Sequence, residues 1–183
     1  MQKTDLESYN NHPYHPGGTA LKRALWYYIN IIFFKSGWFP VFGLKVVLLR
    51  AFGAKIGKNV KFKPCVNIKY PWNLTVGDNA WIGENVWLDS LVMINIGANA
   101  CLSQGSVLLT GSHNYKKSTF DLITGSITLE DGVWVGAGAT INQGITAYSH
   151  AMLTSGSVAT KDLEAYSIYQ GNPAVKIRSR TIE

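Results

Sequence analysis

The chain has 183 residues, of which 46% are hydrophobic and 15% are charged, a composition typical of a folded globular protein rather than a disordered one. Its net charge of +6 suits nucleic acid, an anionic membrane surface or a phosphate-bearing ligand. No RNA-binding, zinc-finger or helix-turn-helix motif accompanies the charge, so nucleic acid is the least favoured partner.

The first twenty residues are polar and do not resemble a signal peptide, and Cys65 and Cys101 lack the spacing of a disulfide framework or zinc site. Both observations predict a cytoplasmic protein with two reduced thiols. We expect one structural domain in three parts. They are an arm and helical segment at 1–55, a repeat region at 56–164 with a loop at 110–126, and a C-terminal tail at 165–183 that packs on the repeats.

Thr19 can cap a helix over residues 20–34, where apolar residues fall near helical spacing: Leu21, Leu25, Tyr28, Ile29, Ile32 and Phe33. A second apolar run, 38–49, is interrupted by Pro40, Gly43 and Lys45. Two interpretations stay open. Both runs pack against the rest of the protein or a sister subunit, or they form an interfacial anchor that makes the protein membrane-peripheral. In the second case the cations would face lipid head groups, namely Lys22, Arg23, Lys35, Lys45 and Arg50.

A six-residue period begins at Ile56. The units start with an aliphatic or aromatic residue. Most have a small or β-branched residue at the fifth place, and nine have Asn or Gly at the fourth place. The side chains at the fifth place and at the next leading place point into the core, and the side chain at the sixth place between them points outward, as a β-strand requires. The fourth place needs positive φ, which Asn and Gly tolerate: Asn59, Asn79, Asn85, Asn99, Gly105, Gly132, Gly138, Gly144 and Gly156. Three such units form one triangular coil, so the repeat predicts a parallel β-helix.

The period is interrupted once. Equivalent leading residues are spaced by 20 from Ile56 to Val76 to Ile96, but by 33 from Ile96 to Leu129. One corner has therefore gained about thirteen residues, and the gain falls on Leu108–Ile127. Loops on rigid frameworks are where sites are built, so we expect this loop to be functional.

The repeat resembles the left-handed β-helix acyltransferases, and the match is closer to the sugar O-acetyltransferases typified by the colanic acid biosynthesis acetyltransferases. The resembling segments are LLRAFGAKIGKNV, YPWNLTVGDNAWIGENVWL, LLTGSHNY, GVWVGAGATI, SGSVATKDL and YQGNPAVKIRSR. The resemblance implies a left-handed coil with helical additions, acetyl-CoA as co-substrate, no metal, and a homotrimer with active sites between subunits.

His113, at the root of the loop, matches the family's catalytic histidine. Transfer of acetyl from a thioester to a hydroxyl needs a general base, which imidazole supplies near neutral pH. No GxSxG motif is present and neither cysteine is near a candidate base, so we expect direct attack rather than an acyl-enzyme. Ser112, Asn114 or a corner N–H could stabilise the oxyanion, and the sequence does not choose among them. Asp89, with Asp121 as the weaker rival, could hold the acceptor or orient the histidine.

Three tryptophans occupy outward sixth places. Trp134 matches the family tryptophan beside the acceptor and pantetheine, whereas Trp81 and Trp87 are assigned to subunit packing. The remaining family positions concern coenzyme A. Gly136, Ala137, Ser155 and Gly156 match the small residues beside the pantetheine arm. Thr160 and Lys161 match the family's Thr-Lys pair, and either Arg178 or Arg180 matches its C-terminal arginine near the nucleotide phosphate.

These residues predict an acetyl-CoA-dependent O-acetyltransferase that acts on a carbohydrate, an exopolysaccharide or surface-glycan precursor. One alternative keeps the fold and changes the acceptor to an amino sugar, serine or a xenobiotic. Another is a structural trimer without turnover. A γ-type carbonic anhydrase is disfavoured because its three histidine ligands have no counterpart here.

Overall fold

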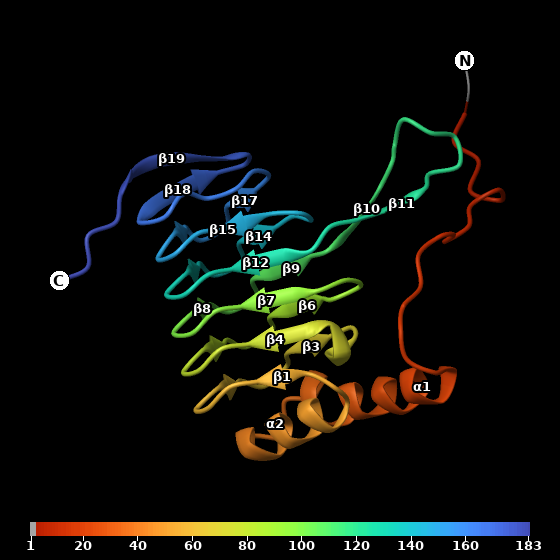
Figure 1. The fold of residues 1–183 in the computed structure, drawn as a ribbon, viewed down its shortest axis with the longest axis horizontal. Helices are drawn as coiled ribbons and strands as arrows, with labels where there is room; N and C mark the ends of the chain where they lie inside the picture. The colour runs from red at the N-terminus through yellow and green to blue at the C-terminus, as the bar shows by residue number, and fades with distance from the viewer. Residues whose placement is uncertain (1–2) are drawn as a thin grey trace.

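The computed structural model describes residues 3–183, so the first two residues of the predicted arm lie outside it. A parallel β-helix stands on a layer of helices, and an extended arm climbs beside it from the helices towards a protruding hairpin (Figure 1). The helical layer comprises α1 (Ala20–Ile29), the π-helix η1 (Asn30–Lys35) and α2 (Phe42–Ala51), and a short 3-10 turn, η2 (Pro71–Asn73), follows the first coil. No helix in residues 3–183 is long and apolar enough to cross a membrane.

Three parallel sheets form the faces of the coil. Sheet A contains β1 (Lys55–Ile56), β4 (Leu74–Val76), β7 (Ile94–Ile96), β12 (Ile127–Leu129) and β15 (Thr146–Ala147). Sheet B contains β2 (Lys61–Phe62), β5 (Trp81–Ile82), β8 (Cys101–Leu102), β13 (Trp134–Val135) and β16 (Met152–Leu153). Sheet C contains β3 (Asn67–Ile68), β6 (Trp87–Asp89), β9 (Val107–Leu109), β14 (Thr140–Ile141) and β17 (Val158–Ala159).

The register of the sheets confirms the six-residue period. Val76 pairs with Ile96 and Ile96 with Leu129, which are the predicted steps of 20 and 33. All predicted leading residues from Ile56 to Ala159 are buried, and so are the predicted fifth-place residues except Val92. Val92 is half-buried because it lies in a wider corner, where its amide meets Thr110 instead of a strand.

The corners also match the prediction. All nine predicted fourth-place residues have positive φ, and Cys65 and His150 adopt it at the same place in their units. A side chain on Gly132 would collide with the stacked His150, because an added Cβ would lie 2.1 Å from His150 Nδ1. His150 is therefore part of the corner stack.

The thirteen-residue gain forms an antiparallel hairpin, β10 (Gly111–His113) and β11 (Leu122–Thr124), at the corner between sheets C and A. Figure 1 shows this hairpin projecting away from the coils. Gly111 lies close to the Leu91 side chain at the root of the hairpin, since an added Cβ would lie 2.5 Å from Leu91 Cδ1 and would have to displace that side-chain end. The hairpin therefore leaves the coil at a closely packed point.

The helical layer packs with an unexpected side inward. Thr19 caps α1 as predicted, accepting a hydrogen bond from the Lys22 amide at 3.2 Å. The buried stripe, however, is Trp26, Asn30 and Phe34. Four residues of the predicted apolar stripe are instead exposed on the surface of the helical layer: Leu21, Leu25, Tyr28 and Ile32. For these four residues, the interpretation that they pack against the chain's own coils is wrong.

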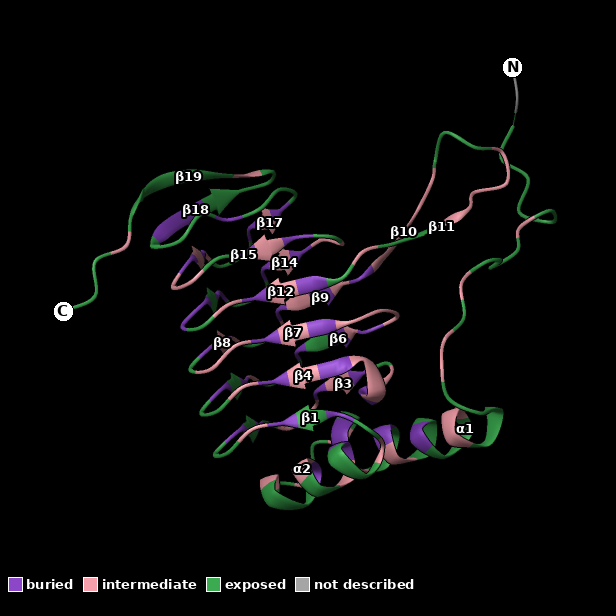
Figure 2. Cartoon of the chain, in the orientation of Figure 1, coloured by how far each residue is buried: buried purple, intermediate pink, exposed green. Residues whose placement is uncertain are grey.

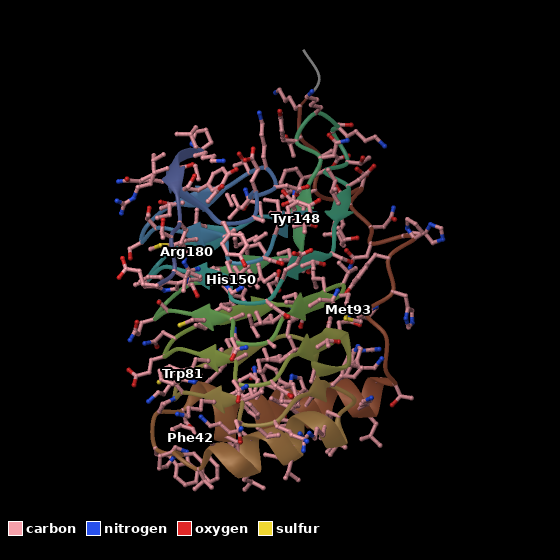
Figure 3. The ribbon with its side chains drawn as sticks, turned by 60° about the vertical axis from the view of Figure 1, so that its left-hand side comes forward. Phe42, Trp81, Met93, Tyr148, His150 and Arg180 are labelled. Carbon is pink, nitrogen blue, oxygen red and sulfur yellow. The ribbon has the colours of Figure 1, made fainter. Side chains whose placement is uncertain are left out.

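The C-terminal residues extend the coil. Strand β18 (Ser167–Gly171) pairs with β16 in sheet B, and β19 (Ala174–Ser179) turns back antiparallel to it. Arg180 then crosses the corner column between sheets A and B, where its Nη1 donates to the carbonyls of Gly132 and His150 at 3.0 Å each. Figure 3 shows Arg180 and His150 on the same side of the upper coils.

Candidate active site

His113 ends strand β10 and is half-buried. Its Nδ1 lies 2.9 Å from the carbonyl oxygen of Phe120, across the hairpin. The two rings are stacked, with 4.4 Å between centroids and 6° between planes. A carbonyl oxygen can only accept a hydrogen bond, so Nδ1 carries the proton. The lone pair of the neutral imidazole is then on Nε2, which is the state that a general base requires.

The N-terminal arm reaches the same place. The ring of Tyr9 meets the edge of His113 at 5.5 Å between centroids, and the amide of Asp5 donates to the Ser118 carbonyl at 2.8 Å. Lower down, the Tyr14 hydroxyl donates to the Leu91 carbonyl at 3.1 Å. Neither Tyr9 nor Phe120 could be predicted from the sequence as a neighbour of His113, because neither contact follows from local periodicity.

The predicted oxyanion donors beside His113 have other contacts. Ser112 pairs with Ile123 across the hairpin. Asn114 closes the hairpin loop, since its amide donates to the Asp121 carbonyl at 2.8 Å and its Oδ1 accepts from the Lys116 amide at 3.1 Å. Both residues lie next to the histidine, and the Asn114 contacts build the loop.

Asp121 is engaged within the hairpin. Its carboxylate accepts hydrogen bonds from Lys117 at 2.8 Å and Thr119 at 2.5 Å, and these bonds lower the pKa of the carboxyl. Nδ1 of His113 is already bonded to the Phe120 carbonyl. The backbone, rather than Asp121 or Asp89, orients the imidazole.

Asp89 ends β6 on the same corner column, one coil below the hairpin, and its backbone carbonyl accepts from Thr110 Oγ1 at 2.6 Å. Burial raises the pKa of its carboxyl, and Lys69 partly opposes this. Burial also raises the pKa of Tyr14 and of Tyr70, and the charge of Asp89 adds to both shifts. Asp89 is therefore a partly desolvated carboxyl that is electrostatically coupled to Lys69, Tyr14 and Tyr70, and it can accept a hydrogen bond from a ligand hydroxyl.

A cavity of about 470 Å³ lies between the helical layer and sheet C. Its lining includes the aromatic residues Tyr70 and Trp87 and three cations, Arg23, Lys35 and Lys69. Of these residues, Lys69 lowers the pKa of the Asp89 carboxyl, and the charge of Asp89 raises the pKa of Tyr70. Asp89 itself does not line the cavity, whereas Lys69, Tyr70 and Trp87 of sheet C and its corner do.

Trp134 is on a different face. It projects from sheet B with 39% of its surface exposed, and its Nε1 donates to Ser103 Oγ at 2.9 Å. It pairs with Cys101, which pairs in turn with Trp81. Below it a groove of about 400 Å³ on sheet B is lined by Trp81, Cys101 and Ser103 among others. Trp81, Trp87 and Trp134 all leave the coil surface, as predicted.

The four small residues predicted beside pantetheine share the corner column between sheets B and C. The Gly156 amide donates to the Ala137 carbonyl at 2.9 Å, and an added Cβ on Gly136 would lie 2.4 Å from the Ser155 amide nitrogen. The successive corners therefore stack with no room for side chains between them. Ala137, Ser155 and Gly156 are exposed, which leaves a smooth track of backbone at the surface.

The predicted phosphate-binding residues separate into two groups. Thr160 and Lys161 are exposed on the corner between sheets C and A, the column that also carries Asp89 and His113. Arg178 is exposed on β19 and free to meet a ligand, whereas Arg180 is bonded to two corner carbonyls.

Within one chain the candidate residues thus occupy two places. His113 and Asp89 lie on the column between sheets C and A, whereas Trp134 and the backbone track lie on sheet B and the column between sheets B and C. The corners of a triangular coil face different directions, so one chain presents two separate half-sites.

No family model matches the chain. It is 38% identical over 166 residues, 90% of each chain, to WcaF of Escherichia coli K12, whose name assigns it to colanic acid biosynthesis as an acetyltransferase. It is 27% identical to the galactoside O-acetyltransferase of Escherichia coli K12 over 72% of this chain and 66% of that one. Among solved structures, a hexapeptide-repeat acetyltransferase of Vibrio cholerae complexed with acetyl coenzyme A superposes with a TM-score of 0.80, at 22% identity over 92% of this chain and 94% of that one.

The structural match confirms the predicted left-handed parallel β-helix. The sequence match covers 90% of the chain. The chain belongs to the family of WcaF, the hexapeptide-repeat acetyltransferases associated with colanic acid biosynthesis.

Proposed function

We propose that the protein transfers acetyl from acetyl-CoA to a hydroxyl of a carbohydrate, with His113 as the general base. The observation that carries this proposal is the bond from His113 Nδ1 to the Phe120 carbonyl, which leaves Nε2 as the proton acceptor. The names of its relatives, an acetyltransferase of colanic acid biosynthesis and a galactoside O-acetyltransferase, support the reaction and the class of acceptor.

The reaction is a direct displacement. The acceptor hydroxyl gives its proton to Nε2 of His113 as its oxygen attacks the thioester carbonyl, and the tetrahedral intermediate then expels the CoA thiolate. The imidazolium returns the proton to the leaving sulfur. Such proton transfer contributes roughly 10²–10⁴-fold to the rate. Asp89 is our candidate for binding the acceptor hydroxyl. Burial raises the pKa of its carboxyl and also of Tyr14 and Tyr70, which indicates a partly desolvated site where a hydrogen bond to the acceptor is strengthened.

We assign coenzyme A to the backbone track formed by Gly136, Ala137, Ser155 and Gly156. A pantetheine arm pairs with exposed backbone, and small residues let it approach closely. Lys161 and Arg178 are exposed cations at this end of the coil that suit the phosphates, whereas Lys176 is paired with Glu164 and Arg180 with its corner carbonyls. Trp134 covers the acetyl end of the arm.

The two half-sites imply that a complete active site needs a second subunit. A homotrimer would bring the column with His113 of one protomer against sheet B of the next, and a heterologous contact of this kind closes into a ring. Acceptor selection then belongs to the hairpin, the arm with Tyr9 and the surroundings of Asp89.

Incubating the protein with acetyl-CoA and a panel of oligosaccharides tests the proposal, with release of free CoA thiol and a mass gain of one acetyl group as the readouts. We expect acceptor-dependent CoA release and an ester-linked product that mild base removes. Stabilisation against heat by acetyl-CoA but no transfer to any sugar, amino sugar or serine would favour a protein without turnover.

A further inference from the structure

The outer surface of the helical layer is apolar although the layer buries polar side chains. Lys45 is fully buried and Asn30 nearly so, whereas Leu21 is 70% exposed and Trp38 66% exposed. Figure 2 shows the burial of the helical layer, which has buried positions beside the coils and exposed positions on its outer side. We call this surface the basal face and define it by its exposed apolar side chains: Leu21, Leu25, Tyr28, Ile32, Trp38, Val41 and Leu44.

The basal face is a continuous stripe on α1 and η1. Leu21, Leu25, Tyr28 and Ile32 recur at intervals of four, three and four residues, which places them on one side of a helix. Trp38 and Val41, between η1 and α2, extend the apolar surface towards Leu44. An apolar stripe of this kind on a folded protein marks an interaction surface.

The charge around the basal face identifies its partner. Residues 8–77, which contain the whole helical layer and the first coil, include no Asp or Glu. The same stretch holds ten cations, five within residues 22–50 and five lysines within 55–69. Two copies placed base to base would therefore set cations against cations, which disfavours a second copy as the partner.

Lipid chemistry fits both features. A helix that lies in a membrane surface buries Leu, Trp and Tyr at the boundary of the acyl chains, while Lys and Arg attract anionic head groups. The exposed cations Lys35 and Lys58 lie at the level of the helices and the first coil. The burial of Lys45 shows that the helices were not simply placed with their most apolar side inward.

We propose that the basal face docks the protein onto an anionic lipid surface, with the coil axis pointing away from the membrane. Asp89 belongs to the second coil and His113 to the third. At about 4.8 Å per strand, both would lie roughly 10–15 Å above the helical layer. Docking would thus hold the acceptor-binding side of the protein close to an acceptor anchored in that lipid surface.

Flotation of the full-length protein with lipid vesicles tests the proposal. We expect binding to vesicles of phosphatidylcholine with roughly a third phosphatidylglycerol, weaker binding to phosphatidylcholine alone, and a decrease with added salt. The triple variant Leu25→Ser, Ile32→Ser, Trp38→Ser should reduce the partition coefficient at least about tenfold. Val175→Ser with Ile177→Ser, exposed on β19 at the opposite end, is the matched control and should bind like the wild type.

A second variant guards against misfolding of the first. Lys35→Glu with Lys58→Glu changes only exposed side chains and should weaken binding to anionic vesicles while acetyl-CoA still stabilises the fold. Failure of the wild type to bind anionic vesicles, or equal binding by the basal and control variants, would overturn the proposal. So would a change in sedimentation mass of the basal variant with unchanged vesicle binding, because the basal face would then be a contact between copies.

Discussion

The imidazole of His113 lies parallel to the phenyl ring of Phe120, and its Nδ1 is bonded to the carbonyl of the same residue. One residue on the opposite strand of the hairpin therefore fixes both the plane of the histidine and its tautomer. Phe120 has φ of 51°, a conformation that a residue with a side chain rarely adopts. The unusual backbone aims the carbonyl at the imidazole.

Phe120→Gly should lower kcat by about tenfold or more, with the KM for acetyl-CoA unchanged, because the imidazole loses its stacking partner while glycine still accepts the positive φ. Phe120→Tyr keeps the ring and should restore most of the activity. Steady-state kinetics of both variants with saturating acceptor provide the measurement. Equal kcat values for the glycine variant and the wild type would show that the stacking has no part in catalysis.

Asp89→Asn should make the protein more stable and less active. Burial raises the pKa of this carboxyl, so ionised Asp89 disfavours the folded state at neutral pH, and the penalty is absent below the ordinary pKa of Asp. The melting temperature of the variant should exceed that of the wild type at pH 7 and match it near pH 3. Its kcat/KM for the acceptor should fall by about 10- to 100-fold, as for a lost bond to a charged group.

Glu84→Gln is the control for that experiment, because Glu84 is an exposed carboxylate on a neighbouring corner. It should change neither the melting temperature nor the kinetics. A stabilised Asp89→Asn variant with full activity would remove Asp89 from the acceptor site.

The coil could be predicted from the sequence because each of its corners and strands is specified by residues that are adjacent in the chain. Each corner is specified by its own Asn or Gly, as at Asn59 and Gly132, and each strand by the residues on either side. The width of the interruption also followed from simple counting. A repeat that needs only its neighbours can be read from a single sequence.

The helical layer and the histidine environment were harder to predict for a physical reason. Both sides of α1 carry large apolar residues, so the pattern cannot say whether Leu25 or Trp26 faces the coils. The contact of Tyr9 with His113 joins residues 104 positions apart, as the arm crosses the side of the coil (Figure 1). His113 itself was identified by its motif, whereas Phe120 depends on a backbone turn that no motif records.

Lys45→Met should stabilise the protein at pH 7 by about 1 kcal/mol or more. Lys45 is fully buried, its Nζ donates only to the Lys63 carbonyl at 3.2 Å among the described residues, and burial lowers its pKa. The charged form is therefore disfavoured in the folded state below the lowered pKa, and the penalty disappears as the pH rises through the ordinary pKa of Lys. Chemical unfolding at pH 7 and near pH 11 should show the gain only at pH 7.

Lys55→Met serves as the comparison, since Lys55 is exposed on β1. This variant should leave the free energy of unfolding within about 0.5 kcal/mol of the wild type at both values of pH. A loss of stability in Lys45→Met would mean that the bond to the Lys63 carbonyl outweighs the burial of the charge.

Mixing two inactive variants tests whether the half-sites meet between subunits. His113→Ala and Trp134→Ala remove residues from different half-sites, so trimers reassembled from equal amounts of both should contain intact sites. A random ring would have roughly a quarter of its sites with His113 and Trp134 both present, and we expect that share of wild-type activity. Activity that stays at the level of the separate variants, with mixed trimers verified by mass spectrometry, would place each site within one chain.

In the proposed reaction, Nε2 of His113 removes the proton from the acceptor hydroxyl. The direct measurement is kcat of His113→Ala on the acceptor that the wild type acetylates, together with binding of acetyl-CoA by calorimetry. We predict a decrease in kcat of at least about 100-fold with acetyl-CoA affinity retained. A His113→Ala variant that keeps near-wild-type turnover would show that His113 is not the general base.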